Sequence, residues 1–236
     1  MHHVLLDRWS RGRSPLHARD PRAKILALLV FLVVLATTPA NAFVTLTIYL
    51  AILMGGILIA GLPAWGLLLR AMAVLPFSLT FALVSWLAGD GLRALGLVEK
   101  SYLSTVAVLL VVGTTPLPRL LDGLAGLGAP RLLILMAQFL YRYLFVISEQ
   151  AQHLRLAAAC RQGTARGRRR GRFRAAAGAL AVLFARSYYR AEGIHRAMLA
   201  RAFSGRFTPQ TGAAVQGTDV FFTLAVAAFL IVVRIQ

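Results

Sequence analysis

Charged residues are scarce in this sequence of 236 residues, and cysteine is nearly absent. Charged residues make up 14% of the chain, hydrophobic residues make up 58%, and the mean hydropathy is +0.71. Soluble domains carry about 25% charged residues, so the composition excludes an ordinary soluble domain and favours several membrane spans. The single cysteine, Cys160, excludes a disulfide framework and offers no spacing for a metal site.

Acidic residues are especially few, and the basic residues are unevenly placed. The chain has 8 Asp and Glu against 26 Lys and Arg, a formal net charge of +18. Residues 1–24 carry six of these cations and residues 153–206 carry thirteen. Because Lys and Arg concentrate on the cytoplasmic side of membrane proteins, both regions are predicted to be cytoplasmic. Nucleic-acid binding is the alternative for so basic a region, but no nucleic-acid motif is present and no such partner is predicted.

Long apolar runs dominate the rest of the chain. No charged residue lies between Lys24 and Arg70, which is room for two crossings, and TTPANA at 37–42 divides the run with turn-forming residues. Residues 89–100 read as a polar loop. The sequence therefore predicts an all-α integral membrane protein with about five transmembrane helices, at 25–37, 43–61, 71–88, 101–116 and 213–233.

The predicted domain division follows from these spans. It comprises a basic cytoplasmic segment (1–24), a membrane bundle of about four spans (25–116), a cytoplasmic helical region (117–212) and a final transmembrane helix (213–236). Within the third part, the apolar run at 175–185 is about 16 Å long as a helix and cannot cross a bilayer of about 30 Å. The run at 131–150 is long enough, but Arg142 at its centre favours a surface helix. A sixth span there stays open.

Two long amphipathic helices are predicted in the cytoplasmic region, separated by a Gly/Arg-rich loop at 164–174. Glycine at Gly163 and at Ser204-Gly205 is expected to end them in the left-handed conformation. Their apolar stripes recur at spacings of three and four. The first stripe contains Leu140, Leu144, Ile147, Ala151, Leu154 and Ala158, and the second contains Leu180, Phe184, Tyr188, Ala191, Ile194, Met198 and Ala202.

Four blocks in order carry a resemblance to a known family. They are SPLHARDPRAK (14–24), TTPLPRLLDGLAGLGAPRLL (114–133), QFLYRYLFVISEQAQHLRLAAACRQG (138–163) and RSYYRAEGIHRAMLARAFSGRF (186–207). Together they resemble the CbiQ/EcfT family, the T component of energy-coupling factor (ECF) importers, over nearly the whole chain. The last block is most similar to the cobalt and nickel branch, while a biotin or other vitamin importer stays open.

The resemblance implies a scaffold rather than an enzyme. In that family two ATP-binding-cassette (ABC) ATPase subunits hydrolyse ATP and a separate membrane S component binds the substrate, so ATP and Mg would bind the partners and this chain would hold no cofactor. An additional small membrane subunit stays open as a partner. A multi-pass location in the cell (inner) membrane is implied, as is a link to cobalamin biosynthesis through the cobalt branch.

The resemblance also implies that cytoplasmic coupling helices end in Ala-Arg-X motifs that dock on the ATPases. The second motif falls on Ala200-Arg201-Ala202, and the first falls on Cys160-Arg161-Gln162, where Cys and Gln depart from the family pattern. Ala165-Arg166-Gly167 matches the letters better, but Arg161 is preferred because it ends an amphipathic helix. Arginine suits such docking because its planar guanidinium always carries charge and offers five donors.

The remaining candidates are structural. Asp20, Pro21 and Arg22 are predicted to pair or cap at the membrane surface, and Pro116 starts the first coupling segment. No metal ligands are predicted, and no phosphate-binding GxxxxGK[ST] loop occurs, so this chain is not expected to hydrolyse ATP. A membrane enzyme acting on lipid or isoprenoid substrates would need acidic clusters, and a channel or carrier would need ionisable residues within the first four spans. Neither pattern is found.

Overall fold

The computed structural model describes residues 9, 10, 12, 14–39, 42–162, 169–203, 217–219, 223, 225, 226 and 228, with the backbone alone at 161, 162, 169, 170 and 172. The regular structure of these residues is helical, which confirms the predicted all-α fold. The chain forms two compact units. The first contains Met1–Ala129 and Pro209–Gln236, and the second contains Pro130–Thr208.

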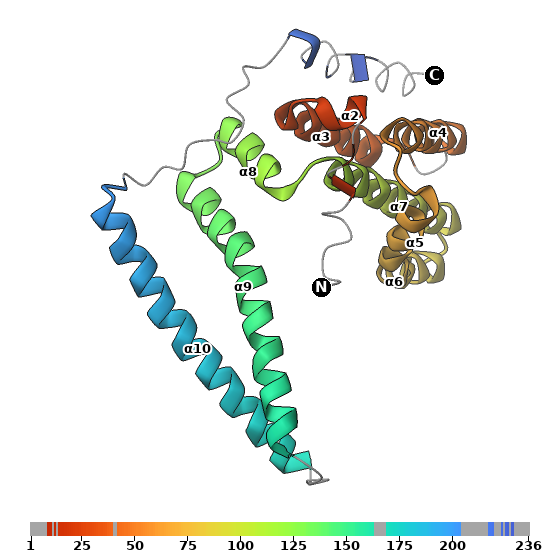
Figure 1. Ribbon diagram of the computed structural model, residues 1–236. Helices are drawn as coiled ribbons and strands as arrows, with labels where there is room; N and C mark the ends of the chain where they lie inside the picture. Colours follow the sequence, from red (N-terminus) through yellow and green to blue (C-terminus); the bar gives the residue numbers. More distant parts are fainter. Residues whose placement is uncertain are drawn as a thin grey trace. The chain divides into compact units, whose positions relative to one another are not determined.

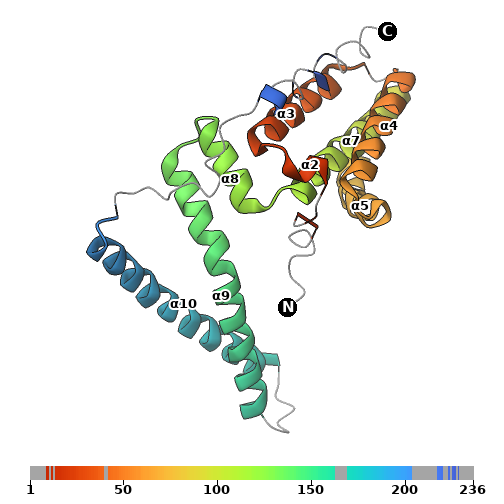
Figure 2. The ribbon, with the colours of Figure 1, turned by 45° about the horizontal axis from the view of Figure 1, so that its top comes forward.

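The first unit is a bundle drawn from red to green in Figure 1. Its helices are α2 (Pro15–Ala18), α3 (Pro21–Thr37), α4 (Phe43–Ala60), α5 (Ala64–Ala71), the 3₁₀ turn η1 (Met72–Val74), α6 (Leu75–Leu87), α7 (Gly91–Thr114) and α8 (Leu117–Gly126). Helices α3 and α4 both pack on α7, and α6 lies along α7 as a hairpin partner. Figure 2 shows α7 at the centre of this arrangement.

The core of the bundle is apolar. Tyr49, Ile57, Leu67 and Val106 are fully buried. The Phe31 ring meets Tyr49 edge to face, with centroids 5.8 Å apart, an arrangement that the ring quadrupoles favour. Burial of these side chains is what holds α3, α4, α5 and α7 together.

Large apolar side chains also cover the outside of the bundle. Val44 and Trp65 are each 76% exposed, and Leu58 and Leu87 are exposed to a similar degree. A helix that is apolar on every side is stable only where its surroundings are also apolar. The bundle is therefore built to lie in a membrane.

Length and composition identify four helical stretches that are able to cross a bilayer among the described residues: Phe43–Ala60, Ala64–Leu87, Gly91–Thr114 and Arg131–Cys160. The first predicted span lies within α3, which has 17 residues, at the lower end of the usual range. The predicted fifth span at 213–233 falls mostly outside the described residues. Helix α9, which contains Arg131–Cys160, keeps the alternative of a further span open.

The predicted polar loop at 89–100 is wrong. The chain reverses at Gly89, which has φ +91°, and α7 then runs from Gly91 to Thr114. Its first turns keep their polar groups at the surface, where Arg93 pairs with Asp90 at 2.8 Å and Glu99 is exposed. A membrane helix need not end where its apolar run ends, because polar side chains at the bilayer surface reach water.

The predicted start of the third span, at residue 71, is also wrong, since the helical stretch that is able to cross the bilayer begins at Ala64.

The second unit is a helical hairpin of α9 (Arg131–Gln162) and α10 (Arg169–Ala200). Both views show the two helices together where α9 ends and α10 begins, and apart at their other ends (Figures 1 and 2). The predicted Gly/Arg loop is wrong for residues 169–174, which form the first turns of α10; residues 164–168 lie outside the described residues. Arginine is a good helix former, and charge does not prevent a helix whose outer face is solvated.

The predicted apolar stripes are only partly correct. On α9, Ile147, Ala151, Leu154 and Ala158 are half-buried as expected, whereas Leu140 and Leu144 are exposed. On α10 only Ile194 and Met198 of the predicted stripe are half-buried, and the rest of it is wrong, because the other members are exposed: Leu180, Phe184, Tyr188, Ala191 and Ala202. The half-buried positions in the earlier half of α10 are Ala175, Ala179, Leu183 and Ser187. Small side chains let two helices approach closely, so the alanine-rich face packs and the aromatic face is left outside.

The left-handed glycine that ends α4 gives a test of the bundle. Gly61 has φ +65°, and a Cβ there would meet no atom within 4 Å. Gly61→Ala is expected to destabilise the protein by about 1–2 kcal/mol, because the left-handed conformation costs an L-residue that much. Denaturant unfolding in detergent micelles, followed by circular dichroism, measures the change.

Gly55→Ala is the matched control on the same helix. Gly55 lies within α4, and a Cβ there also meets nothing within 4 Å, so this change should leave stability unchanged or raise it slightly. Equal destabilisation by both variants would contradict a backbone origin for the effect.

Candidate functional site

The C-terminal end of α10 is closed by a tight backbone reversal. The Phe203 N–H donates to the Met198 carbonyl at 3.0 Å, and the Ala202 N–H donates to the Leu199 carbonyl at 3.0 Å. This pair of bonds around a left-handed residue is a Schellman motif. Arg201 is the last residue before the reversal and is exposed.

The left-handed residue is Ala202, with φ +54°. The expected glycine stop at Ser204-Gly205 is therefore wrong for α10: the reversal comes earlier, and Ser204 and Gly205 lie outside the described residues, as does Gly163. Met198 and Phe203 are both half-buried, as the apolar contact that accompanies the motif requires. The two backbone hydrogen bonds close the helix here and leave alanine in a conformation that glycine adopts more readily.

Arg201 is well placed to bind a partner. Among the described residues, no ion pair or side-chain hydrogen bond engages its guanidinium. In contrast, Arg196 of the same helix pairs with Glu192. A cation at a helix C-terminus is also favoured by the helix dipole. Ala200 and Ala202 are exposed and small, so nothing beside Arg201 obstructs a close approach.

The other predicted motif lies at the end of α9. Cys160 is exposed, and Arg161 and Gln162 are the last two residues of the helix. The alternative motif Ala165-Arg166-Gly167 lies outside the described residues. Arg161 is thus the last but one described residue of α9, and its choice as the first motif stays a prediction.

The hairpin keeps the two arginine motifs apart. Helix α10 contains 32 residues, so its ends are about 48 Å apart at 1.5 Å per residue. The first motif lies near the start of α10 and the second at its end (Figure 1). Arg161 and Arg201 are thus separated by about one helix length, which is too far for both to enter one binding groove.

Asp20, Pro21, Arg22 and Pro116 lie together in the first unit. The Asp20 carboxylate accepts the Arg22 N–H at 2.8 Å as the N-cap of α3, and Pro21 occupies the first turn. Pro116 is the residue before α8. Arg19 pairs with Asp219 at 3.6 Å, which attaches the C-terminal part of the chain to this corner.

Lys24 belongs to the same corner but was not among the predicted site residues. It is 4% exposed, and its ammonium contacts the end of α7. The signal in the sequence is a lysine placed directly before a long apolar run, in a chain whose cations are otherwise almost all arginine.

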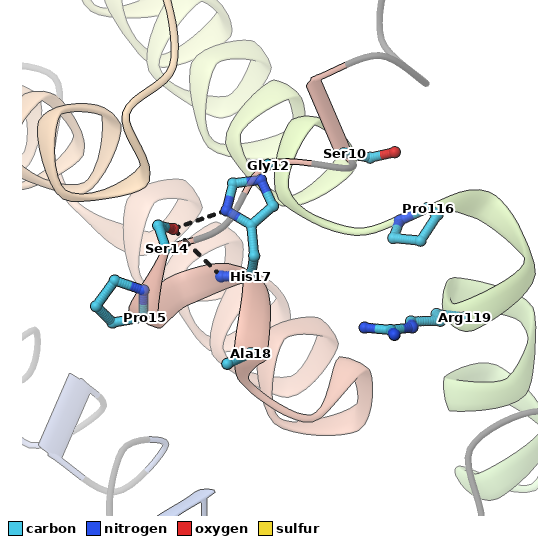
Figure 3. Close-up of a pocket in the computed structure, with 8 residues that line it drawn as sticks. All are labelled: Ser10, Gly12, Ser14, Pro15, His17, Ala18, Pro116 and Arg119. Atoms are coloured by element: carbon cyan, nitrogen blue, oxygen red, sulfur yellow. Dashed lines mark hydrogen bonds between the residues drawn. The ribbon is translucent and has the colours of Figure 1, made fainter.

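A pocket of about 680 Å³ lies between the α2 segment and α8. Figure 3 shows Ser14 and His17 on one wall and Arg119 reaching from α8 toward it. His17 Nε2 lies 3.0 Å from the Trp9 carbonyl and Nδ1 lies 2.7 Å from Ser14 Oγ. A carbonyl only accepts, so the neutral ring donates from Nε2 and accepts the Ser14 hydroxyl at Nδ1. These bonds hold the segment around α2 in place.

The described residues contain no group of three or more His, Cys, Asp or Glu side chains arranged to hold a metal ion. The prediction that this chain holds no metal itself stays a prediction.

Comparison with known proteins identifies the family. The CbiQ family model, described as a cobalt transport protein, matches residues 12–211. The chain belongs to the CbiQ family. It is also similar to the energy-coupling factor transporter transmembrane protein EcfT of Bacillus selenitireducens, with 29% identity over 233 residues that cover 86% of this chain and 84% of that protein.

CbiQ proteins are membrane components of transporters, so the apolar bundle and the family agree on a membrane location. The match extends over the bundle, both long helices and both arginine motifs. It supports a transport role and does not distinguish a metal substrate from a vitamin.

The left-handed conformation of Ala202 at the end of α10 predicts the effect of a glycine substitution in this CbiQ protein. Ala202→Gly is expected to stabilise the helix end by about 1 kcal/mol or somewhat more, because glycine adopts positive φ without the penalty of an L-residue. Hydrogen exchange of the amides of residues 198–203 should slow accordingly.

Ala200→Gly is the opposite control, since Ala200 is the last helical residue of α10. A glycine there should cost about 1 kcal/mol and speed the exchange of the same amides. Faster exchange in both variants would contradict the assignment of strain to Ala202.

Proposed function

We propose that the chain is the T component of an energy-coupling factor importer, which couples ATP hydrolysis by two partner ABC ATPases to uptake of a cobalt or nickel ion by a membrane S component. The observation that carries this proposal is the hairpin of two 32-residue helices. Arg161 is the last but one residue of α9 and Arg201 directly follows α10, so the two arginines lie about one helix length apart. The family match supports the transport role.

The arginine ends supply the docking chemistry. An exposed guanidinium offers five donors in a rigid fork that suits carboxylates and the carbonyls at a helix end. The Schellman reversal at Ala202 turns the chain away directly after Arg201. The helix tip can therefore enter a groove on an ATPase without the following chain obstructing it.

The separation of the motifs supports two docking partners. Arg161 and Arg201 cannot share one groove across about 48 Å. Paired ATPase subunits offer two equivalent grooves, one for each motif. When the ATPases open and close, the distance between the grooves changes, and stiff helices held at their tips carry this displacement toward the membrane.

The orientation that this mechanism requires follows from the charge distribution. Residues 1–24 and 117–212 are cytoplasmic in the proposal, because their cations place them on the inner side of the cell membrane. The ATPases then meet the arginine motifs in the cytoplasm, and the S component lies beside the bundle in the bilayer. An additional small membrane subunit is compatible with this arrangement.

A separate observation supports the choice of substrate. The description of the matching family favours cobalt, while the name of the similar EcfT protein specifies no substrate. A biotin or other vitamin importer uses the same kind of scaffold and is the alternative. Uptake of radiolabelled Co²⁺, Ni²⁺ and biotin by the reconstituted complex distinguishes these cases, and accumulation of biotin alone would replace the metal assignment.

Removing both arginine anchors tests the coupling role. Arg161→Ala with Arg201→Ala is expected to reduce co-purification of the ATPases at least tenfold, because each anchor is lost with its charged hydrogen bonds. Each single variant should retain the ATPase through the other motif. The measurement is affinity purification of the tagged chain after co-expression with ABC ATPases encoded beside its gene.

Arg186→Ala with Arg190→Ala is the matched control, because these arginines are exposed on α10 away from its end. The control should co-purify ATPases like the unmodified chain. If the anchor variant and the control behave alike, or if the unmodified chain captures no ATPase, the proposed function is wrong.

A further inference from the structure

The chain has only two lysines, and both bind the end of a neighbouring helix. Lys24 of α3 contacts the last residue of α7. Lys100 of α7 contacts the carbonyl of Thr38, the C-cap of α3. Each of these two helices, α3 and α7, therefore supplies a lysine that binds the C-terminal end of the other. The two contacts lie at opposite ends of the bundle.

Lys24 makes its contacts from a buried position. Its Nζ donates to the Thr114 carbonyl at 3.2 Å and to Thr115 Oγ1 at 2.8 Å. Lys24, Thr114 and Thr115 are 4%, 1% and 2% exposed. Unpaired polar groups are costly when buried, and these hydrogen bonds give the ammonium two acceptors and the end of α7 a donor.

The helix dipoles explain the direction of this contact. Lys24 lies in the first turns of its own helix, where a positive charge is unfavourable. At the C-terminus of α7 the same charge is favourable. The favourable interaction of Lys24 with the end of α7 therefore explains its location, because its interaction with the dipole of α3 is unfavourable.

The contacted residues form the junction between the bundle and α8. Thr115 is extended at φ −140° and ψ 120°, as expected for a residue before proline. Pro116 follows at φ −63° as the N-cap of α8 and has no N–H of its own. Because proline cannot donate to the end of α7, Lys24 supplies the missing donor.

The start of α3 also lies directly against α8. A Cβ on Gly123 would come within 3.1 Å of both Pro21 Cβ and Ile25 Cδ1, and one on Gly126 would clash with the Arg22 guanidinium. The two glycines, three residues apart, leave one face of α8 bare for Pro21 and Arg22. The segment from Asp20 to Ile25 thus holds both the end of α7 and the side of α8.

We infer that Lys24 is a positioning residue, which fixes the direction in which α8 leaves the membrane bundle. Helix α8 is followed in the chain by α9, so displacement of the arginine-tipped hairpin reaches the bundle through this junction. That second step rests on the proposed function. The local claim concerns only α3, α7 and α8.

The local claim is tested by a distance measurement between α3 and α8. Spin labels replace Leu29 of α3 and Leu124 of α8, which are exposed, in a Cys160→Ser background. Pulsed electron spin resonance on the full chain in lipid nanodiscs should give one narrow distance distribution. Lys24→Met, which keeps the volume and removes the donor, is expected to broaden or shift it.

Three further variants separate positioning from general loss of stability. Thr115→Val removes one acceptor of the same contact and should broaden the distribution in the same direction, with no additional effect in the double variant. Lys24→Arg restores charge and donors and should return the distribution toward that of the unmodified chain. Lys100→Met is the matched control at the opposite end of α3 and α7 and should leave it unchanged.

Unchanged distances in Lys24→Met, or equal broadening in Lys100→Met, would overturn the inference. The functional step is read separately in the reconstituted complex. Lys24→Met should retain bound ATPases but lower uptake per ATP hydrolysed several-fold, for whichever of Co²⁺, Ni²⁺ and biotin the unmodified complex accumulates. If the unmodified chain binds no ATPase, the proposed function fails while the distances still decide the role of Lys24. If uptake per ATP stays normal, Lys24 has no part in coupling.

Discussion

Backbone groups at helix ends lack partners within the helix and must find them elsewhere. The structure meets this constraint in different ways at three helix ends. Lys24 and Lys100 each reach across to the end of a neighbouring helix, and the end of α10 folds back on itself at Ala202. The first two contacts fix the bundle, and the third leaves Arg201 exposed at a helix tip.

The bundle and the hairpin differ in where their polar and apolar side chains lie. The bundle is apolar inside and outside, and its polar contacts concentrate where α3, α7 and α8 meet. The hairpin is different: the half-buried face at the start of α10 contains Ala175 and Ala179, and the aromatic side chains of α10 are exposed. A rigid anchor in the membrane and a long hairpin with cationic tips are the two parts that a mechanical coupling subunit needs. The membership of the CbiQ family is consistent with that combination.

The sequence predicted the apolar spans and the two long helices because length and periodicity are strong signals. It misplaced features that depend on contacts between elements. The segment 89–100 was read as a loop, although its polar side chains reach the surface from a helix. A glycine was expected to end α10, although the pairing of Met198 with Phe203 sets the reversal at Ala202. The packed face of α10 was predicted from hydrophobicity. In the structure the half-buried face at the start of α10 contains Ala175 and Ala179, because small side chains allow a close approach. Lys24 was not recognised because its partners lie about ninety residues away.

Photo-crosslinking from the tip of α10 tests the central claim most directly. A photoreactive amino acid replaces Ala200, beside Arg201, or Ala191, which is exposed on the same helix, in membranes that also contain the ABC ATPases. The account predicts an ATP-binding-cassette subunit crosslinked from position 200 and not from position 191, and loss of that product when Arg201→Ala is added. Equal crosslinking from both positions, or a product from position 200 that persists without Arg201, would contradict it.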